Sequence, residues 1–343
     1  MKPLLNTLHV TTDGAYLACQ RETVCVRVER KTRAQFPIHL LEGIVCLGRI
    51  GVSPGLLDLC GRSGVPLSLL TTGGRFIARI QGPTTGNVLL RRAQYRAADD
   101  GERSATVARS VVIGKVSNCR NVLMRAARDR PEDVSAATLS RAANDLSGIL
   151  QTLQPPRSLD VVRGYEGEAA AAYFAVFDHL IALQKDGFRF EKRSRRPPLD
   201  PVNALLSFIY TLLLHDCVGA AEAVGLDPAV GFLHRDRPGR PGLALDLMEE
   251  LRPILADRLV LSLINRRQIA ADGFRNTESG AVLMDDATRK EVLIAYQTRK
   301  QETIRHPFID EDVPLGLLPH VQALLLARHL RGDLDGYPPF LWK

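Results

Sequence analysis

The first part of the chain is a series of short apolar runs separated by turn residues, a pattern typical of β-structure. Turn signals stand at Asp13-Gly14, at residues 20–23 and at residues 72–74. Ser53 followed by Pro54 predicts a short helix, because serine caps helix N-termini and proline fits the first helical position. The strands that this pattern predicts cover residues 4–10, 16–20, 24–28, 36–41, 43–47, 66–70 and 75–80.

From residue 88 onward the apolar residues recur with a helical period. Helix 102–128 is expected to carry its Lys and Arg residues, Lys115 among them, on a polar face. Residues 199–217 are almost wholly apolar and predict a core helix, with Asn203 as a hydrogen-bonding residue near its start. The other predicted helices cover residues 93–96, 135–153, 243–251, 254–264, 288–300 and 317–331. The pattern predicts an α+β fold: a β-rich domain over residues 1–92 and a larger all-α domain over residues 93–343.

The stretch around His234 is the strongest candidate for chemistry. Residues 235–242 form a Gly/Pro-rich loop, and a run of good helix formers follows. Asp246, Glu249 and Glu250 are spaced to project from one face of that helix, where they repel one another. A bound cation would offset this repulsion, and a histidine beside carboxylates suits Mn²⁺, Mg²⁺ or Zn²⁺. The alternative is a solvated acidic face beside a loop histidine.

Glu166 and Glu168 open another predicted helix, whose apolar positions include Tyr173 and Phe177. In a first turn, both glutamates would simply complement the positive end of the helix dipole. A ligand from outside the His234 stretch would favour the metal site over the acidic face. The residues by themselves leave this choice open.

The net positive charge of the chain favours a polyanionic partner. The 343 residues carry a net charge of +7, and residues 1–96 hold 13 Lys/Arg against 5 Asp/Glu. A basic N-terminal part beside an acidic cluster is typical of a protein that holds nucleic acid while metal-binding carboxylates act on it. Many proteins are basic for other reasons, so charge alone decides little.

Composition narrows the class of protein. Hydrophobic content of 45% and charged content of 24% are typical of a soluble globular protein. The six cysteines form no Cys-x-x-Cys pair, so neither a zinc site nor a disulfide framework is indicated. No apolar run approaches the roughly 18–20 residues that a bilayer-spanning helix needs. The start has too short an apolar stretch to be a signal peptide, and together these observations predict a cytoplasmic protein without membrane contact.

Three segments together resemble one family. They are Gly164-Tyr-Glu-Gly-Glu-Ala-Ala-Ala-Ala-Tyr-Phe174, Asp200-Pro-Val-Asn-Ala-Leu-Leu206, and Gly231-Phe-Leu-His234 through Leu245-Asp-Leu-Met-Glu-Glu-Leu-Arg-Pro253. In this order they resemble the CRISPR-associated protein 1 family, the integrase and endonuclease of spacer acquisition. The resemblance to this family extends over essentially the whole chain. The ending Tyr337-Pro-Pro-Phe-Leu-Trp-Lys343 is similar to the type I-C branch.

The resemblance implies that Glu166, His234 and Glu249 form a catalytic metal triad for Mg²⁺ or Mn²⁺. Some members have aspartate where this chain has Glu249. Asp246 is also acidic in the family and is expected to ligate the metal or to support a ligand. Glu168 and Glu250 keep their interpretation as surface or supporting charges.

The implied activity is that of a metal-dependent DNA endonuclease and integrase. It joins the 3′-hydroxyl ends of a captured double-stranded DNA fragment to CRISPR repeat DNA by transesterification. The implied assembly is a homodimer, formed through the β-rich domain, in complex with CRISPR-associated protein 2. Arg237 and Arg240 are expected to contact DNA phosphates, as are Arg163 and Arg252, although these last two could instead make intramolecular salt bridges.

Two alternatives remain. A non-catalytic DNA-binding protein with a structural acidic cluster would keep its function when Glu166, His234 and Glu249 are neutralised. The second alternative is a metal hydrolase that acts on a small phosphoester. The chain lacks the motif His-Glu-x-x-His, which argues against a hydrolase of the metalloprotease type. The basic N-terminal part favours a large polyanion over a small substrate.

Overall fold

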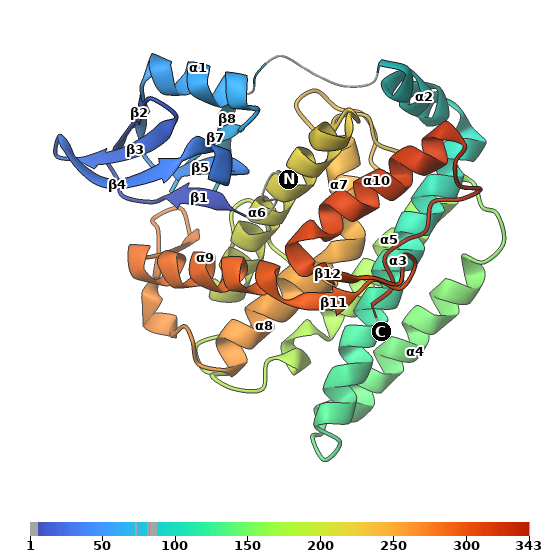
Figure 1. Ribbon diagram of the computed structural model, residues 1–343. Coiled ribbons are helices and arrows are strands. Elements are labelled where there is room, and N and C mark those ends of the chain that lie inside the picture. The colour runs from blue at the N-terminus through green and yellow to red at the C-terminus, as the bar shows by residue number, and fades with distance from the viewer. Residues whose placement is uncertain (1–5, 73, 81, 83–87, 343) are drawn as a thin grey trace. The chain divides into compact units, whose positions relative to one another are not determined.

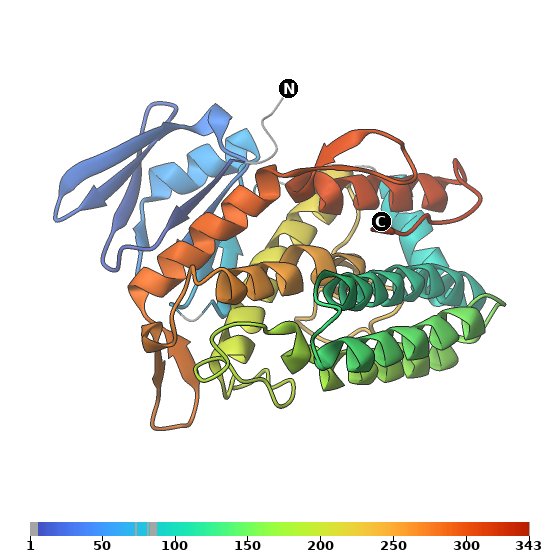
Figure 2. The same cartoon turned by 90° about the horizontal axis from the view of Figure 1, so that it is seen from below.

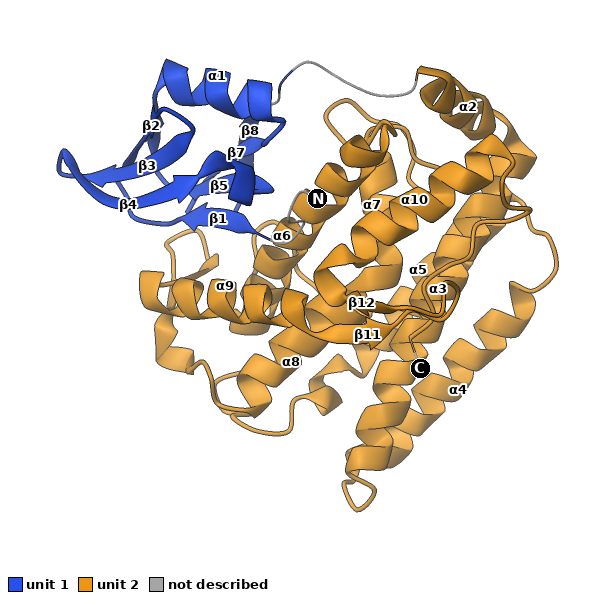
Figure 3. Cartoon of the chain, viewed as in Figure 1, with its two compact units in different colours: residues 1–85 blue, residues 86–343 orange. Residues whose placement is uncertain are grey.

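The computed structural model describes residues 6–72, 74–80, 82 and 88–342. Two compact units make up the chain: unit 1 covers residues 1–85 and unit 2 covers residues 86–343 (Figure 3). The expected boundary after residue 92 falls inside helix α2 (Val88–Asp99). The beginning of the first expected strand, residues 4–5, lies outside the described residues.

Unit 1 contains two four-stranded sheets (Figure 1). One sheet has three parallel strands and an antiparallel edge strand, in the order β1 (Thr7–Val10), β5 (Gly43–Leu47), β7 (Leu67–Leu70) and β8 (Phe76–Ile80). The other sheet runs in the order β4 (Lys31–Pro37), β3 (Thr23–Val28), β2 (Tyr16–Gln20) and β6 (Gly51–Val52). The β-rich character expected for the N-terminal part is confirmed.

Helix α1 (Pro54–Ser63) begins as its sequence predicts. Ser53 Oγ accepts a hydrogen bond from Leu56 N at 3.2 Å, and Pro54 opens the helix. Gly64 ends it with a φ of +60°, a conformation that glycine adopts without strain. The expected strand 36–41 is wrong. Strand β4 ends at Pro37 and a 3₁₀ turn, η1 (Ile38–Leu40), follows, because proline cannot continue a ladder of N–H donors.

Unit 2 is mostly helical. Besides α2, its helices are α3 (Gly101–Asp129), α4 (Ser135–Thr152), α5 (Leu159–Ala175), α6 (Pro201–Val224), α7 (Gly242–Leu251), α8 (Arg258–Asn265), α9 (Asp286–Gln301) and α10 (Leu318–Arg331). Helices α3 and α4 lie side by side, the teal and green pair in Figure 2. Helix α3 also packs against α5 and α7, and α6 packs against α7 and α10.

The C-terminal unit is not purely helical. It also contains two small antiparallel hairpins, which the helical pattern did not predict: β9 (Phe274–Asn276) with β10 (Val282–Met284), and β11 (Thr303–Arg305) with β12 (Asp312–Pro314). Each strand has only three residues, too few for a period to show in the sequence. Short 3₁₀ turns are η2 (Phe177–Leu180), η4 (Ala271–Gly273) and η5 (Leu315–Leu317).

Two helix boundaries differ from expectation in ways that matter for the site. Helix α5 begins at Leu159, so Glu166 and Glu168 lie in its interior and their expected first-turn position is wrong. The glycines that precede them reduce helix stability but do not stop a helix. After α7 the helix continues past Pro253 through a π-helical segment, η3 (Arg252–Asp257), directly into α8. A π segment re-routes the hydrogen bonds where proline has no N–H to donate.

Helix α6 is the central core helix that its composition predicts. Among the described residues it alone is long and apolar enough, by those two criteria, to cross a membrane, so the expectation that no run reaches that length is wrong. More than half of this stretch, 56%, is buried inside the protein, where α6 contacts α7 and α10. Asp200 caps the helix, and Asn203 Nδ2 donates to Lys192 O at 2.8 Å, so its predicted hydrogen-bonding role is confirmed.

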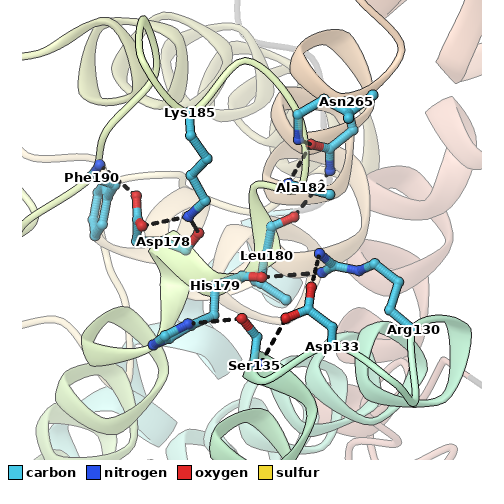
Figure 4. Close-up of polar contacts among 11 residues, drawn as sticks. Arg130, Asp133, Ser135, Asp178, His179, Leu180, Ala182, Lys185, Phe190 and Asn265 are labelled. Atoms are coloured by element: carbon cyan, nitrogen blue, oxygen red, sulfur yellow. Dashed lines mark hydrogen bonds and ion pairs between the residues drawn. The ribbon is translucent and has the colours of Figure 1, made fainter.

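Polar contacts hold η2, the turn that follows α5, in place (Figure 4). Asp178 Oδ1 accepts a hydrogen bond from Phe190 N at 2.9 Å, which closes the loop that follows. Ser135 Oγ lies 3.1 Å from His179 Nδ1, and Asn265 Nδ2 donates to Leu180 O at 3.0 Å. The turn η2 is thereby tied to the start of α4 and the end of α8.

Candidate functional site

The loop before α7 is folded around the carboxylate of Asp246. This side chain is 1% exposed, and its Oδ2 accepts hydrogen bonds from Phe232 N at 2.6 Å and Leu233 N at 3.0 Å. Its Oδ1 accepts from His234 N at 3.0 Å. A Cβ at Gly231 would lie 2.8 Å from Asp246 Oδ2, so glycine is required where the loop meets the helix. One buried carboxylate therefore fixes the backbone that carries His234.

The same carboxylate orients the imidazole of His234. Nδ1 lies 2.7 Å from Asp246 Oδ1, while Nε2 points the other way and lies 3.7 Å from Glu249 Oε1. A carboxylate accepts a hydrogen bond from the Nδ1–H group, which leaves the lone pair on Nε2 free to bind a metal ion. Asp246 therefore acts on His234, and Nε2 is directed toward Glu249.

Lys115, on α3, lies between the two predicted glutamate ligands. Its Nζ forms an ion pair with Glu166 Oε1 and is 2.7 Å from Glu249 Oε2. Lys115 is 6% exposed, so its expected place on a polar helix face is wrong. Burial would lower the pKa of this ammonium, but Glu249 and Glu166 together raise the pKa, and Lys115 carries a full charge.

Arg252 is the second cation at Glu249. Its Nη1 lies 2.7 Å from Glu249 Oε1, and its guanidinium stacks 4.9 Å from the centre of the Tyr210 ring. Burial would raise the pKa of the Glu249 carboxyl, yet Arg252 and then Lys115 lower that pKa to about 2. Glu249 is therefore an ionised carboxylate at any physiological pH.

The structure thus brings Glu166, His234 and Glu249 together from α5, the loop before α7, and α7 itself. Of the four arginines expected to contact DNA, Arg252 and Arg163 make intramolecular contacts. Arg163 Nε donates to Leu233 O at 2.7 Å, and its Nη1 lies 3.1 Å from an Asp160 carboxylate oxygen. Arg237 and Arg240 lie in the loop after His234, exposed and half-buried respectively.

The donor set fits a divalent ion. Within the described parts of the chain, no group of three or more His, Cys, Asp or Glu side chains is arranged as a finished metal site; here Lys115 lies between Glu166 and Glu249. Two carboxylates and the Nε2 of an oriented imidazole are nevertheless ligands that Mg²⁺, Mn²⁺ or Zn²⁺ accept. Glu249 Oε2 is also buried without a hydrogen bond, since its contact with Lys115 lacks hydrogen-bond geometry.

Glu250 is not the surface or supporting charge that its spacing indicated. It is 0% exposed and faces away from His234, because adjacent helix residues point about 100° apart. Its carboxyl accepts hydrogen bonds from Phe340 N at 2.6 Å, from Gln322 Nε2 at 3.2 Å and from the Tyr337 hydroxyl. Burial raises its pKa to about 7. Glu168, in contrast, is exposed as expected.

The C-terminal tail packs against the back of this site. Asn118, one turn after Lys115, donates to Glu250 O at 2.8 Å and to Phe340 O at 2.9 Å, and accepts from Trp342 N at 2.7 Å. The tail therefore ties α3 to α7. Sequence reasoning missed Lys115 and Asn118, because residues 111–123 also contain Ser117, Arg120 and Asn121, and the pattern does not show which of these polar residues is buried.

A cavity of about 390 Å³ opens beside Lys115 and Arg252. Lys192, Arg193 and Arg195 also line it, from the basic loop after α5, so that among its charged lining residues the cations outnumber the carboxylates of Glu191 and Asp257. Such a cavity can accept a phosphate group next to the carboxylates.

The chain is similar to known proteins in sequence and in fold. The family model described as CRISPR associated protein Cas1 matches residues 8–298. A CRISPR-associated endonuclease Cas1 of Chlorobaculum tepidum is 54% identical over 343 residues, which cover 100% of both chains. A casposase bound to integration product has a TM-score of 0.84 at 20% identity, over 98% of this chain and 94% of that one. A chain of a Cas6-RT-Cas1–Cas2 complex has a TM-score of 0.82 at 20% identity, over 98% of this chain and 36% of that one. The chain belongs to the Cas1 family of CRISPR-associated proteins.

Proposed function

We propose that the chain is a metal-dependent DNA endonuclease and integrase that inserts captured DNA fragments into a CRISPR array. The observation that supports this most directly is the convergence of Glu166, His234 and Glu249 from separate elements, with Asp246 orienting the imidazole. Full-length identity of 54% to a curated Cas1 endonuclease supports the same activity.

Glu166, Glu249 and the Nε2 of His234 would hold Mg²⁺ or Mn²⁺. Such an ion would supply Lewis-acid chemistry there: it would polarise the scissile phosphate and stabilise the charge on the attacking and leaving oxygens. Asp246 keeps the Nδ1 proton on His234 and thereby keeps Nε2 available. The nucleophile is the 3′-hydroxyl of the captured fragment, so the protein itself supplies no covalent nucleophile.

The cations around the site would hold the DNA backbone. Lys115 and Arg252 border the cavity where a phosphate would enter, and Arg237 and Arg240 follow His234 in the loop. Contacts of this kind neutralise phosphates without reading bases, which suits the capture of fragments of any sequence. Arg163 supports the loop through Leu233 O and contributes less to DNA binding.

The partners follow from the family. We expect captured double-stranded DNA and CRISPR repeat DNA as substrates, Cas2 as protein partner, and a homodimer formed through unit 1, all in the cytoplasm. The common fold with a chain of a Cas6-RT-Cas1–Cas2 complex supports the Cas2 assembly.

A joining assay tests the reaction and the site together. A labelled 3′-hydroxyl DNA fragment and a supercoiled plasmid with a CRISPR repeat are incubated with Cas2, Mn²⁺ or Mg²⁺, and either wild type or His234→Ala. His179→Ala is the matched control, because His179 is also half-buried but bonds Ser135 away from the site. We expect metal-dependent joining by wild type and His179→Ala and none by His234→Ala. Equal joining by His234→Ala would refute the triad, and DNA binding without joining by any protein would favour a binding module.

A further inference from the structure

The two glutamates of the site are already neutralised by cations of the chain itself. Lys115 Nζ contacts Glu166 Oε1 and lies 2.7 Å from Glu249 Oε2, and Arg252 lies 2.7 Å from Glu249 Oε1. Two carboxylates thus face two cations, and their charges sum to zero. A divalent ion added to this group meets two fixed positive charges within a few ångströms, and in a buried setting such repulsion is only weakly screened.

The two cations differ in how freely they can leave. The guanidinium of Arg252 is planar and is held by its stacking on Tyr210 as well as by Glu249. Lys115 carries a point charge on a flexible four-carbon stem, which can turn without losing its donors. The cavity of about 390 Å³ beside it gives the ammonium a second place to go.

We propose that Lys115 competes with the divalent ion for Glu166 and Glu249, and that bound DNA relieves this competition by drawing the ammonium toward a phosphate in the adjacent cavity. This inference rests on the proposed function, since it takes the two glutamates and His234 as the metal ligands. Its consequence is thermodynamic coupling: metal binds weakly to the protein alone and tightly with DNA, and DNA binding is strengthened by metal to the same extent.

Metal affinity without DNA tests the competition directly. Mn²⁺ binding to the full-length protein is measured from the electron paramagnetic resonance signal of the free ion, for wild type and Lys115→Met. Methionine keeps much of the stem volume and removes the charge. We expect Lys115→Met to bind Mn²⁺ at least tenfold more tightly than wild type. Unchanged or weaker binding would overturn the proposal.

Two further variants separate charge from packing. Lys185→Met removes an exposed lysine that is paired with Asp178 and with none of the three proposed metal ligands. We expect this variant to bind Mn²⁺ as wild type does. Lys115→Arg keeps the positive charge, so we expect no gain in affinity from it. A gain in Lys115→Arg equal to that in Lys115→Met would show that shape rather than charge controls the site.

The coupling can be measured on wild type, even if Lys115→Met does not fold. Mn²⁺ affinity is compared with and without a short duplex whose 3′ ends are dideoxy, after correction for Mn²⁺ bound by the duplex alone. We expect DNA to tighten Mn²⁺ binding at least tenfold, and unchanged affinity would contradict the proposal. Glu249→Gln separates the existence of the metal site from the competition by Lys115. If Glu249→Gln binds Mn²⁺ like wild type, the metal site itself is wrong; if it loses Mn²⁺ while Lys115→Met shows no gain, only the competition is wrong.

Discussion

Glu249 and Glu250 are neighbours on α7, and both are buried, yet their surroundings are opposite. Glu249 faces Lys115 and Arg252, which lower its pKa to about 2 against the effect of burial. Glu250 faces a hydroxyl, an amide side chain and a backbone N–H, and burial raises its pKa to about 7. Burial is nearly equal at the two positions, so the partners decide which carboxyl is a charged ligand and which is a hydrogen-bonding anchor.

The comparison extends to the two sides of α7. The side toward His234 is an ionic cluster in which the loss of one charge leaves others uncompensated. The side toward the tail is a network of neutral partners, in which Glu250 accepts a hydrogen bond from Phe340 N and Asn118 accepts one from Trp342 N. We infer that the first side serves chemistry and the second holds α3 and α7 at a fixed spacing.

The sharpest test of this difference changes each glutamate to its amide. Glu249→Gln removes a metal ligand and its charge, and we expect the joining rate to fall about a thousandfold, as when a transition-state contact is lost. Glu250→Gln keeps the shape, and the Tyr337 hydroxyl can turn to accept from the new amide, so we expect a rate within severalfold of wild type. Initial rates in the joining assay measure both. A comparable loss of joining rate in the two variants would show that Glu249 and Glu250 do not differ in their roles.

The next largest effect is expected on the side of α7 that faces the C-terminal tail. Phe340 is 0% exposed, and its ring lies 5.4 Å from the ring of His306. Phe340→Ala should lower the free energy of unfolding by about 3–5 kcal/mol, through lost burial and the cavity that remains. Urea unfolding measures this, and Leu341→Ala, at a side chain that is 37% exposed, is the control with a smaller expected loss. A loss in Phe340→Ala no larger than in Leu341→Ala would mean that the tail is only loosely docked.

Asp257 offers a pH test of what neutral partners do to a buried carboxyl. Its Oδ1 accepts a hydrogen bond from the Tyr210 hydroxyl at 2.6 Å, and burial raises its pKa to about 6. The folded state therefore binds a proton that the unfolded state has already released between about pH 4 and pH 6. The stability contributed by protonated Asp257 is complete below this window and is lost as the pH rises through it.

The matching variant is Asp257→Asn, which has no proton to release. We expect the free energy of unfolding of wild type, relative to this variant, to fall on the order of 2 kcal/mol between pH 4 and pH 6 and to stay level above. Urea unfolding of both proteins from pH 4 to pH 8 gives the difference. A difference that rises with pH would show that the cations near Asp257 outweigh its burial.

These contrasts also show what the sequence could and could not predict. The β-rich start, the helical remainder and the capped helix at Ser53 follow from short-range patterns, and the structure confirms them. Lys115 escaped prediction because its burial depends on Glu166 and Glu249, which are distant along the chain. Glu250 was misplaced because its spacing from Asp246 fits the same helix face, while its partners come from the tail.

For a similar reason, the three metal ligands could be assigned only from the resemblance to a family and not from local sequence patterns. Nearness along the chain placed His234 beside the helix that carries Asp246 and Glu249, but nothing local connects Glu166 to them. The helix boundary before Glu166 was also wrong, because α5 continues through Gly164 and begins at Leu159. Tertiary contacts, which no local pattern encodes, bring α5 against α3 and place Glu166 next to Lys115.

Asp246 is a third buried carboxylate on α7, which touches His234 and backbone N–H groups. In Asp246→Asn the amide oxygen, in the place of Oδ2, can still accept from Phe232 N and Leu233 N. The amide N–H₂, in the place of Oδ1, then faces His234 Nδ1 and leaves the backbone N–H of His234 without its acceptor. Nδ1 becomes the acceptor, the proton moves to Nε2, and Nε2 can no longer bind a metal ion without losing it. We expect Mn²⁺ affinity to fall about 10-fold to 100-fold, measured as above, with the exposed Asp236→Asn as control. If Asp246→Asn bound Mn²⁺ like wild type, His234 would not be a ligand through Nε2, and charge partners alone would separate the glutamates of α7.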